Sequence, residues 1–209
     1  METPRAYTPS EKVRLILLSL GVAMIMAVIV VLPAFLLHSL ARGISPVALA
    51  ASATTRHVAL DIMPAKPGGP AANWPAYIAS TPLTVPANTV VTVTIRNFDL
   101  GDAALVSDSP LAKVQGTING AASVDGQQYR ALDAAKVAHT FTIPQLGLNV
   151  PIPGDAPNNA SYLTITFSFR TGSAGTYTFQ CFAPCGTDNG FGGPMASMAY
   201  MKGTLTVQG

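Results

Sequence analysis

The sequence predicts an all-β sandwich preceded by a single apolar segment near the N-terminus. Several short segments alternate apolar and polar residues, and clusters of Gly, Pro and Asn separate them. Alternation with a period of two is typical of half-buried strands, and short strands separated by turn residues are typical of sandwiches. The apolar segment, residues 15–37, carries no charge. About 20 such residues cross a bilayer as a helix.

This apolar segment predicts a retained membrane anchor. A cleaved signal peptide is the alternative, but its apolar region spans only about 7–15 residues. Three basic residues, Arg5, Lys12 and Arg14, precede the segment, and only Arg42 follows closely. The positive-inside rule therefore predicts a single-pass protein of the cell membrane with a cytoplasmic N-terminus. We expect a cytoplasmic tail at 1–13, a transmembrane helix at 14–38, a connector at 39–70 and an extracytoplasmic domain at 71–209.

Charge is scarce in the C-terminal part of the chain and is balanced there. Residues 56–209 hold eight Lys and Arg, eight Asp and no Glu. Proteins that bind nucleic acid need a basic surface. We therefore expect no nucleic-acid partner.

Strand patterns cover most of the predicted domain. They occur at 91–95, 139–143, 163–170 and 177–181, and again at Leu205 and Val207. Turns are expected at 97–99, 151–157, 172–175 and 190–194. Residues 100–135 are less regular, and for them we expect a long loop with a hairpin or a short helix.

The C-terminal third of the chain contains an unusual set of metal-binding side chains. His139 lies on one expected strand, and Cys181 shares the inward face of another with Tyr177 and Phe179. Cys185 follows shortly afterwards, and the methionines 195, 198 and 201 come next. Thiolate, imidazole and thioether ligands favour copper over hard cations. The pattern therefore predicts a copper site at one end of the sandwich.

The same residues carry a resemblance to a known family. The segments His139-Thr-Phe-Thr-Ile-Pro144, Cys181-x-x-x-Cys185-Gly and Met201-x-Gly-Thr resemble ligand segments of cytochrome oxidase subunit II, in its single-helix form. The resemblance covers about residues 80–209, interrupted at 100–135. It implies a cupredoxin-like Greek-key β-sandwich. It also implies a dinuclear copper centre with bridging thiolates from Cys181 and Cys185, His139, Met201 and the backbone carbonyl of Ala183.

One ligand of that family is missing from this chain. The family's second histidine lies four positions after the second cysteine and three before the methionine. Those positions hold Asn189 and Met198, and no histidine follows His139. An amide is a poor copper ligand. We therefore expect at most one copper per chain.

The two thiols leave three alternatives open. Cys181 and Cys185 bind copper with His139 and a methionine, for which Met201 is preferred over Met198 and Met195. Alternatively they form a disulfide, as is common outside the cytoplasm. In the third alternative they are reduced and hold nothing.

The resemblance implies a subunit II-like component of a respiratory haem–copper oxidase-type complex. Such a subunit docks on the large subunit, where it either transfers electrons or has a structural role, and it supplies no catalytic residue itself. The electron donor is not specified by the sequence. A stand-alone, membrane-anchored cupredoxin that binds copper or carries electrons is the alternative, and a purely structural ectodomain held by a disulfide is a third.

Overall fold

The computed structural model describes residues 9–10, 55–67, 74–155, 160–185 and 193–209. The chain divides into two compact units, Met1–Ser52 and Ala53–Gly209. The predicted membrane segment, 14–38, lies outside the described residues and stays a prediction. Within the described ranges, no helix is long and apolar enough to cross a membrane.

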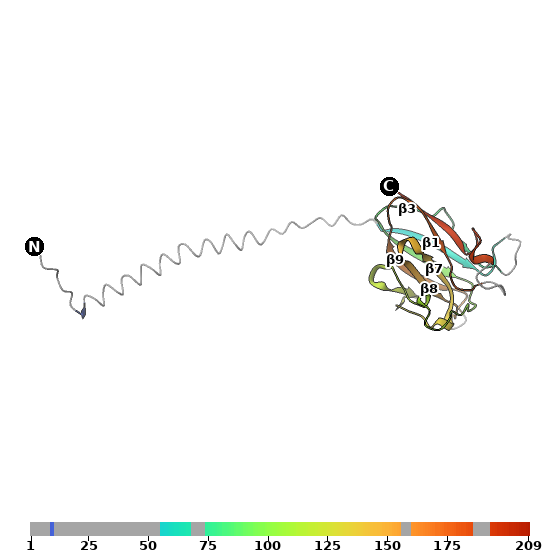
Figure 1. The fold of residues 1–209 in the computed structure, drawn as a ribbon, viewed down its shortest axis with the longest axis horizontal. Helices are drawn as coiled ribbons and strands as arrows, with labels where there is room; N and C mark the ends of the chain where they lie inside the picture. The colour runs from blue at the N-terminus through green and yellow to red at the C-terminus, as the bar shows by residue number, and fades with distance from the viewer. Residues whose placement is uncertain (1–8, 11–54, 68–73, 156–159, 186–192) are drawn as a thin grey trace, which may run out of the picture. The chain divides into compact units, whose positions relative to one another are not determined.

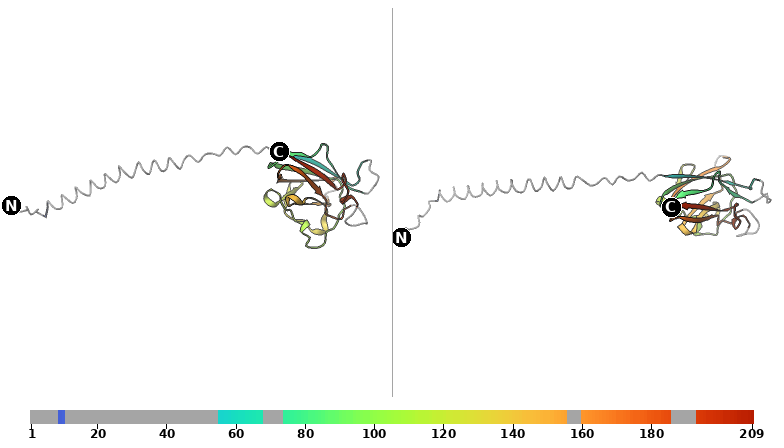
Figure 2. Two further views of the ribbon diagram at one scale, coloured as in Figure 1. Left: turned by 45° about the horizontal axis from the view of Figure 1, so that its top comes forward. Right: turned by 90° about the horizontal axis from the view of Figure 1, so that it is seen from above.

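The second unit is a sandwich of two β-sheets, as Figure 1 and the two further views of Figure 2 show. One sheet has the order β2-β1-β4-β9-β5-β6 and the other has the order β3-β11-β10-β7-β8. Short 3-10 turns interrupt the connections between strands. The strands are β1 (Arg56–Met63), β2 (Ala76–Ile78), β3 (Thr84–Pro86), β4 (Val90–Asn97), β5 (Ala122–Val124), β6 (Gln127–Tyr129), β7 (Val137–Ile143), β8 (Leu148–Pro153), β9 (Leu163–Arg170), β10 (Gly175–Gln180) and β11 (Lys202–Gln208), and the 3-10 helices are η1 (Pro110–Ala112), η2 (Ile118–Gly120), η3 (Ala134–Lys136), η4 (Pro144–Leu146) and η6 (Gly193–Met195).

The clearest sequence alternations form the centre of the first sheet. Strands β4 and β9 pair antiparallel along their whole length, from Val90 opposite Arg170 to Asn97 opposite Leu163. Every second residue of each strand is buried. The all-β prediction is thereby confirmed for the described residues. The irregular stretch at 100–135 contains the β5–β6 hairpin, as expected.

Two segments differ from the sequence prediction. Strand β1 lies within the stretch assigned to the connector, where Leu60 and Ile62 are buried and the residues on either side of them are more exposed. Strand β8 includes Pro151 and Pro153, which fall in a predicted turn. Proline lacks a backbone N–H and is tolerated in a strand at the edge of a sheet. Strand β8 is such an edge strand: β7 lies on one side of it, and on its other side the described residues form a single isolated bridge, between Asn149 and Gln115.

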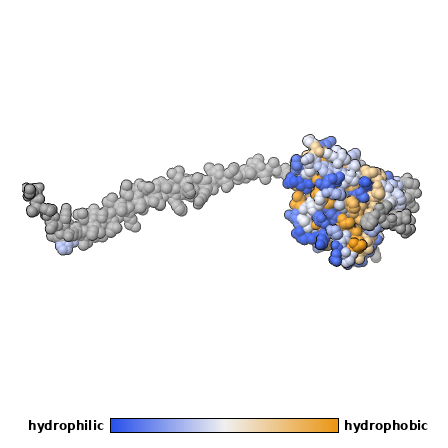
Figure 3. Space-filling model, viewed as in Figure 1, coloured by the Kyte–Doolittle hydropathy of each residue, from blue (hydrophilic) through white to orange (hydrophobic). Residues whose placement is uncertain are grey.

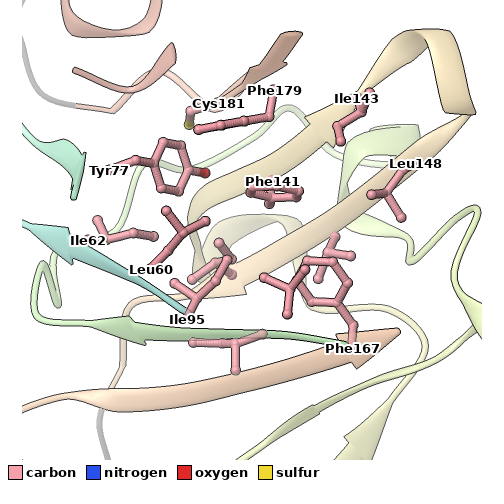
Figure 4. Packing of buried hydrophobic residues seen from close by; sticks show 14 of the residues in the cluster. Leu60, Ile62, Tyr77, Ile95, Phe141, Ile143, Leu148, Phe167, Phe179 and Cys181 are labelled. Carbon is pink, nitrogen blue, oxygen red and sulfur yellow. The ribbon is translucent and has the colours of Figure 1, made fainter. Parts of the chain in front are cut away.

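Aromatic rings fill the core between the sheets. Phe141 of β7 stacks on Phe179 of β10 with ring centroids 5.1 Å apart, and it contacts Phe167 of the opposite sheet at 5.5 Å. Tyr77 of β2 meets both Phe141 and Phe179 edge to face. Figure 4 shows Cys181 beside Phe179 and Tyr77, at the margin of this cluster. The core therefore supports one wall of the predicted metal site.

The surface of the domain mixes hydrophilic and hydrophobic residues in the view of Figure 3. Four large hydrophobic side chains are exposed among the described residues, and they come from separate parts of the chain: Val106, Ile118, Tyr162 and Met198. Single exposed apolar side chains are normal on soluble domains. They do not by themselves identify a docking surface.

Gly203 is required by the packing of the core. It lies opposite Phe179 in the β10–β11 pair, and a Cβ atom at this position would be 2.3 Å from Cζ of the Phe179 ring. That ring is held by Phe141 and Tyr77, so it cannot move away freely. We predict that Gly203→Ala lowers the free energy of unfolding by about 1–3 kcal/mol, the usual cost of overpacking. Chemical denaturation of the full chain measures this effect.

The matched control is Gly101→Ala, where the added Cβ atom would meet only Asp99 Oδ1 at an ordinary 3.8 Å. We expect it to change stability by less than about 0.5 kcal/mol. Equal effects of the two substitutions would contradict the packing role of Gly203.

Candidate metal centre

His139 reaches the site from strand β7. The pairing of β7 with β8 shifts register between Val137 and His139, which leaves Ala138 as an extra residue. Such bulges re-aim side chains and are frequent beside functional sites. His139 alternates with Phe141 on the core-facing side of the strand, and its side chain is 1% exposed. The bulge thus places a buried imidazole at the end of the aromatic core.

Cys181 follows directly after β10, in the register that β11 imposes. Its backbone N–H donates to the carbonyl of Met201 at 2.9 Å, which continues the pairing of Gln180 with Lys202. Residues directly opposite in an antiparallel pair project to the same face. Cys181 and Met201 therefore share one face, and both are fully buried.

A tight turn returns the second thiol to the first. The backbone N–H of Cys185 donates to the carbonyl of Ala183 at 2.7 Å. The Sγ atoms of Cys181 and Cys185 are 3.2 Å apart, and the two residues are free thiols in the structure. The same Ala183 carbonyl is 3.5 Å from Cys181 Sγ, so it lies beside the thiol as the resemblance implies.

These elements bring three predicted donors together. One ligand atom each from His139, Cys181 and Cys185 lies within 4.8 Å of the other two, and all three residues are buried. Residues far apart in the sequence thus meet at one point. Within the described ranges this is the group of His, Cys, Asp and Glu side chains suited to holding a metal ion.

The predicted methionines lie in different environments. Met201 is buried beside Cys181, as its register requires, and Met195 is also buried. Met198 is 53% exposed. A side chain that exposed is poorly placed to join a cluster whose members are each at most 2% exposed. Burial therefore leaves Met201 and Met195 as candidate thioether donors, and Met201 is the one that shares a face with Cys181.

Thr140 links the two donor segments through its backbone and its hydroxyl. Its N–H donates to Cys181 Sγ at 3.4 Å, and its Oγ1 accepts from the N–H of Phe182 at 2.8 Å. The carbonyl of Thr140 accepts from the hydroxyl of Tyr77 at 2.7 Å. The residue next to the histidine thus fixes the chain on both sides of the first cysteine.

A buried polar chain continues from Thr140 along the second sheet to its edge strand β8. The hydroxyl of Thr142 donates to Asn149 Oδ1 at 2.7 Å and is 3.0 Å from that of Thr140. The Thr142 hydroxyl is the donor in both contacts, and because a hydroxyl has one proton, it shares that proton between Asn149 Oδ1 and Thr140 Oγ1. The Asn149 side chain donates in turn to the carbonyls of Leu111 and Lys113. Every member is satisfied, which is the condition for such a network to rigidify a core.

The two thiols have opposite pKa shifts. Burial alone would raise the pKa of Cys181, but Cys185, His139 and the N–H of Thr140 outweigh burial and lower the pKa well below its ordinary value. Contact with the Cys181 sulfur, followed by burial, raises the pKa of Cys185. The geometry agrees, because the Cys185 thiol donates to Cys181 Sγ. Of the two thiols, Cys181 is therefore the one whose surroundings favour the thiolate, the form that binds metal ions.

The imidazole of His139 is buried between charged groups. Burial acts to lower its pKa, but Asp99 and the Cys181 sulfur outweigh burial and raise the pKa to about 9. Asp99 Oδ2 lies 3.2 Å from Nε2. Among the described residues, neither ring nitrogen has a partner in hydrogen-bonding geometry. The Asp99 carboxylate lies off the axis of the N–H bond, so its attraction to the ring is electrostatic.

This unpartnered ring is the observation that fits a metal. Buried polar atoms are nearly always hydrogen-bonded, and an exception calls for an explanation such as an ion. Here both nitrogens of a ring that is 1% exposed lack a hydrogen bond to any described residue, and two sulfurs lie within 4.8 Å. Two thiols and an imidazole are donors of the type that copper selects. The residues present therefore fit the group that the sequence predicts.

A cavity of about 390 Å³ leads to these donors. His139 and Cys185 form part of its wall, together with Asp99 and Asp102. Two donors are thus reachable from a space large enough to hold water. An ion has a route to the cluster along a wall that carries two carboxylates.

Comparison with solved structures finds matches that cover about three quarters of this chain. Auracyanin B aligns at 25% identity and a TM-score of 0.30, over 76% of this chain and 91% of that chain. The copper protein rusticyanin aligns at 18% identity and a TM-score of 0.34, over 74% and 78%. Rusticyanin from Thiobacillus ferrooxidans aligns at 17% identity and a TM-score of 0.33, over 74% and 77%. No family model and no curated protein matches the sequence.

Two mixed sheets, a histidine on β7 and a cysteine after β10 make an all-β, cupredoxin-like sandwich. The finer resemblance, to cytochrome oxidase subunit II, stays a prediction.

Sequence reasoning misses two residues of the site. The sequence patterns identify Thr140 only as a strand residue and Asp99 only as a turn residue. Asp99 lies in a different segment from His139, with the whole irregular stretch between them, so no local spacing connects the two. The alternation at 139–143 could have indicated Thr140. Every residue of β7 is buried, so the polar residues that alternate with the apolar ones need hydrogen-bond partners inside the domain.

The hydroxyl of Thr140 is expected to stabilise the loop that carries the thiols. Thr140→Val keeps the shape of the side chain but leaves the N–H of Phe182 without an acceptor. We predict a loss of about 1–3 kcal/mol in the free energy of unfolding, the cost of an unsatisfied buried group. Denaturant unfolding of the reduced chain measures it.

Thr206→Val serves as the control, because Thr206 lies on the exposed face of β11. We expect a change within about 0.5 kcal/mol for this surface position. If Thr140→Val were as mild, the hydroxyl would not hold the loop.

Proposed function

We propose that the domain binds one copper ion through His139, Cys181 and Cys185, with Met201 as a further donor, and acts as an electron carrier. The observation that carries this proposal is the buried cluster itself, in which an imidazole with no hydrogen bond to the described residues lies within 4.8 Å of two thiols. Copper, when bound, supplies one-electron transfer between its Cu(I) and Cu(II) states.

The chain's own residues would keep such a site rigid and largely shielded from water. The donors are at most 2% exposed, and water can approach them where His139 and Cys185 line the cavity. The N–H of Thr140 donates to the sulfur of Cys181, and this bond stabilises negative charge on that atom. Hydrogen bonds to a ligating sulfur and a hydrophobic shell are the means by which copper proteins set their redox potential. The aromatic rings of Phe179 and Tyr77 provide that shell beside Cys181 (Figure 4).

The proposal gives a definite stoichiometry. We predict that the full-length chain, purified in detergent and fully reduced, binds one Cu(I) per chain, as measured by competition with a chromophoric chelator. Cys181→Ser and Cys185→Ser should each weaken binding by more than the roughly 10–100-fold typical of an outer-shell change, because a hard hydroxyl replaces a soft thiolate. Met201→Leu should weaken binding less, and Met198→Leu, which alters an exposed side chain, should leave it unchanged.

Other outcomes select the alternatives. Two coppers per chain with a mixed-valence spin-resonance signal would favour the dinuclear centre of the oxidase subunit II family. No binding after full reduction would leave a Cys181–Cys185 disulfide or an empty thiol pair. Counting thiols before and after reduction then separates those two.

The finer proposal is that this carrier is a subunit II-like part of a respiratory haem–copper oxidase-type complex. It rests on the sequence resemblance and on the predicted single anchor at 14–38, which would place the domain outside the cytoplasm. We expect a haem-containing partner to copurify from native membranes in mild detergent, detected by its absorption spectrum. Copper-loaded protein without any haem partner would favour the stand-alone carrier.

A further inference from the structure

Asp99 is the charged side chain paired with His139 outside the donor cluster. Its Oδ2 atom is 3.2 Å from Nε2 of His139. The donor cluster, in which all ligand atoms lie within 4.8 Å of one another, consists of His139, Cys181 and Cys185. The carboxylate therefore faces one nitrogen of the ring and is not one of the clustered donors, although it lines the same cavity as Cys185.

The backbone around Asp99 is held in place on several sides. The Asn97 side chain, which is fully buried, accepts from the N–H of Asp99 and donates to the carbonyl of Pro153. Phe98 pairs with β1 through the carbonyl of Ile62, and Ala103 pairs with β7 through the carbonyl of Val137. The carboxylate is thus carried on a fixed segment and is not on a free loop.

The Asp99 carboxylate lies between solvent and the buried ring of His139. The Asp99 side chain is 23% exposed and forms part of the cavity wall, so water solvates it on one side. On the other side lies a ring that is 1% exposed and that has no hydrogen bond to the described part of the chain. A solvated carboxylate against a buried imidazole attracts a proton to the nitrogen that faces it.

We propose that Asp99 is the positioning residue of the metal centre: it holds the proton of His139 on Nε2 and so leaves Nδ1 to bind the ion beside the two sulfurs. Metal-binding histidines commonly pass their second N–H to a carboxylate, which fixes the tautomer and the orientation of the ring. The contact between Asp99 and Nε2 becomes a hydrogen bond with a small rotation of the ring or the carboxylate. This role rests on the proposed metal binding and extends it to a residue that follows the end of β4.

The proposal separates Asp99 from Asp102, which lines the same cavity. Both carboxylates contribute negative charge near the site, but among the described residues only Asp99 forms an ion pair with His139. A general electrostatic effect would be shared by the two aspartates. A positioning role belongs to Asp99 alone.

The test uses the reduced full-length chain in detergent, with Cu(I) affinity as the first readout. We expect Asp99→Ala to weaken Cu(I) binding by about 10–100-fold, the usual effect of losing an outer-shell partner. Asp99→Asn, which keeps the shape and one acceptor oxygen, should fall between Asp99→Ala and the unmodified chain. Asp102→Asn should change affinity by less than about threefold, because a screened charge acts weakly at a distance. Circular dichroism confirms that each variant is folded.

Two spectroscopic readouts distinguish positioning from ligation. In the Zn(II)-loaded, ¹⁵N-histidine-labelled chain, long-range nitrogen–proton spectra should show the proton of His139 on Nε2. Assignment is simple because the chain has three histidines, and His57→Gln and His38→Gln remove the other two signals. In the Co(II)-loaded chain, Asp99→Asn should leave the d–d band intensity of the unmodified protein, since no ligand is lost.

Several results would overturn this inference. They are equal affinities for Asp99→Ala and Asp102→Asn, a proton on Nδ1 in the loaded protein, or a change of coordination number in the Co(II) spectrum of Asp99→Asn. If the unmodified reduced chain bound no metal, the proposed function would fail and this role with it. Metal binding that is normal in every Asp99 variant would reject the positioning role alone.

Discussion

The register of strand β10 is the constraint on which the site depends. Gln180, its last residue, lies opposite Thr142 of β7 on one side and Lys202 of β11 on the other. Side chains in a strand alternate between faces, so a slip of one residue would turn Cys181 away from the core. It would also remove Met201 from the same face. One central strand, held on both sides, therefore determines whether imidazole and thiol can meet.

The register is reinforced by groups that cannot be shifted independently. Phe179 occupies the space above Gly203, which only a residue without a side chain leaves open. Thr140 forms hydrogen bonds with Cys181 and Phe182, so both the backbone and a side-chain hydroxyl of β7 hold the end of β10 in place. Apolar packing and buried hydrogen bonds thus specify the same alignment. When packing and hydrogen bonding favour the same register, the native structure is strongly preferred over alternative compact structures.

The sequence predicted the parts of this arrangement that depend on local patterns. Alternation located β4, β7, β9 and β10, and the residue types of His139, Cys181 and Cys185, together with the family resemblance, indicated the donors. Alternation did not reveal β8, because Pro151 and Pro153 are typical of turns and only the edge position makes them acceptable. Strand β1 was not predicted because it joins the first sheet through a parallel pairing with β4, which lies well beyond it in the sequence. Parallel partners leave no turn signature between them, so local reading cannot find them.

The contact between Asp99 and His139 could not be predicted from local sequence patterns either. Its proximity to His139 exists only because the end of β4 and the start of β7 meet across the domain, joined by the bond from Ala103 to Val137. The eight aspartates of the domain look scattered in the sequence, and nothing in the neighbourhood of Asn97 and Phe98 indicates a metal. Tertiary structure alone selects one of these aspartates and places it against the buried ring.

The donor set favours a single ion over a pair. A dinuclear centre bridged by two thiolates requires a terminal ligand on each ion, and the described residues offer one imidazole beside the sulfurs. Met201 can complete one coordination sphere from the face that it shares with Cys181. Of the described donors that the resemblance names, a second ion would then have the bridging sulfurs and the Ala183 carbonyl, which also accepts from the N–H of Cys185. Two soft sulfurs, an imidazole and a thioether around one ion stabilise the reduced state of copper more than the oxidised state. An electron carrier with these ligands would therefore have a high reduction potential and would give up its electron only to a strong oxidant.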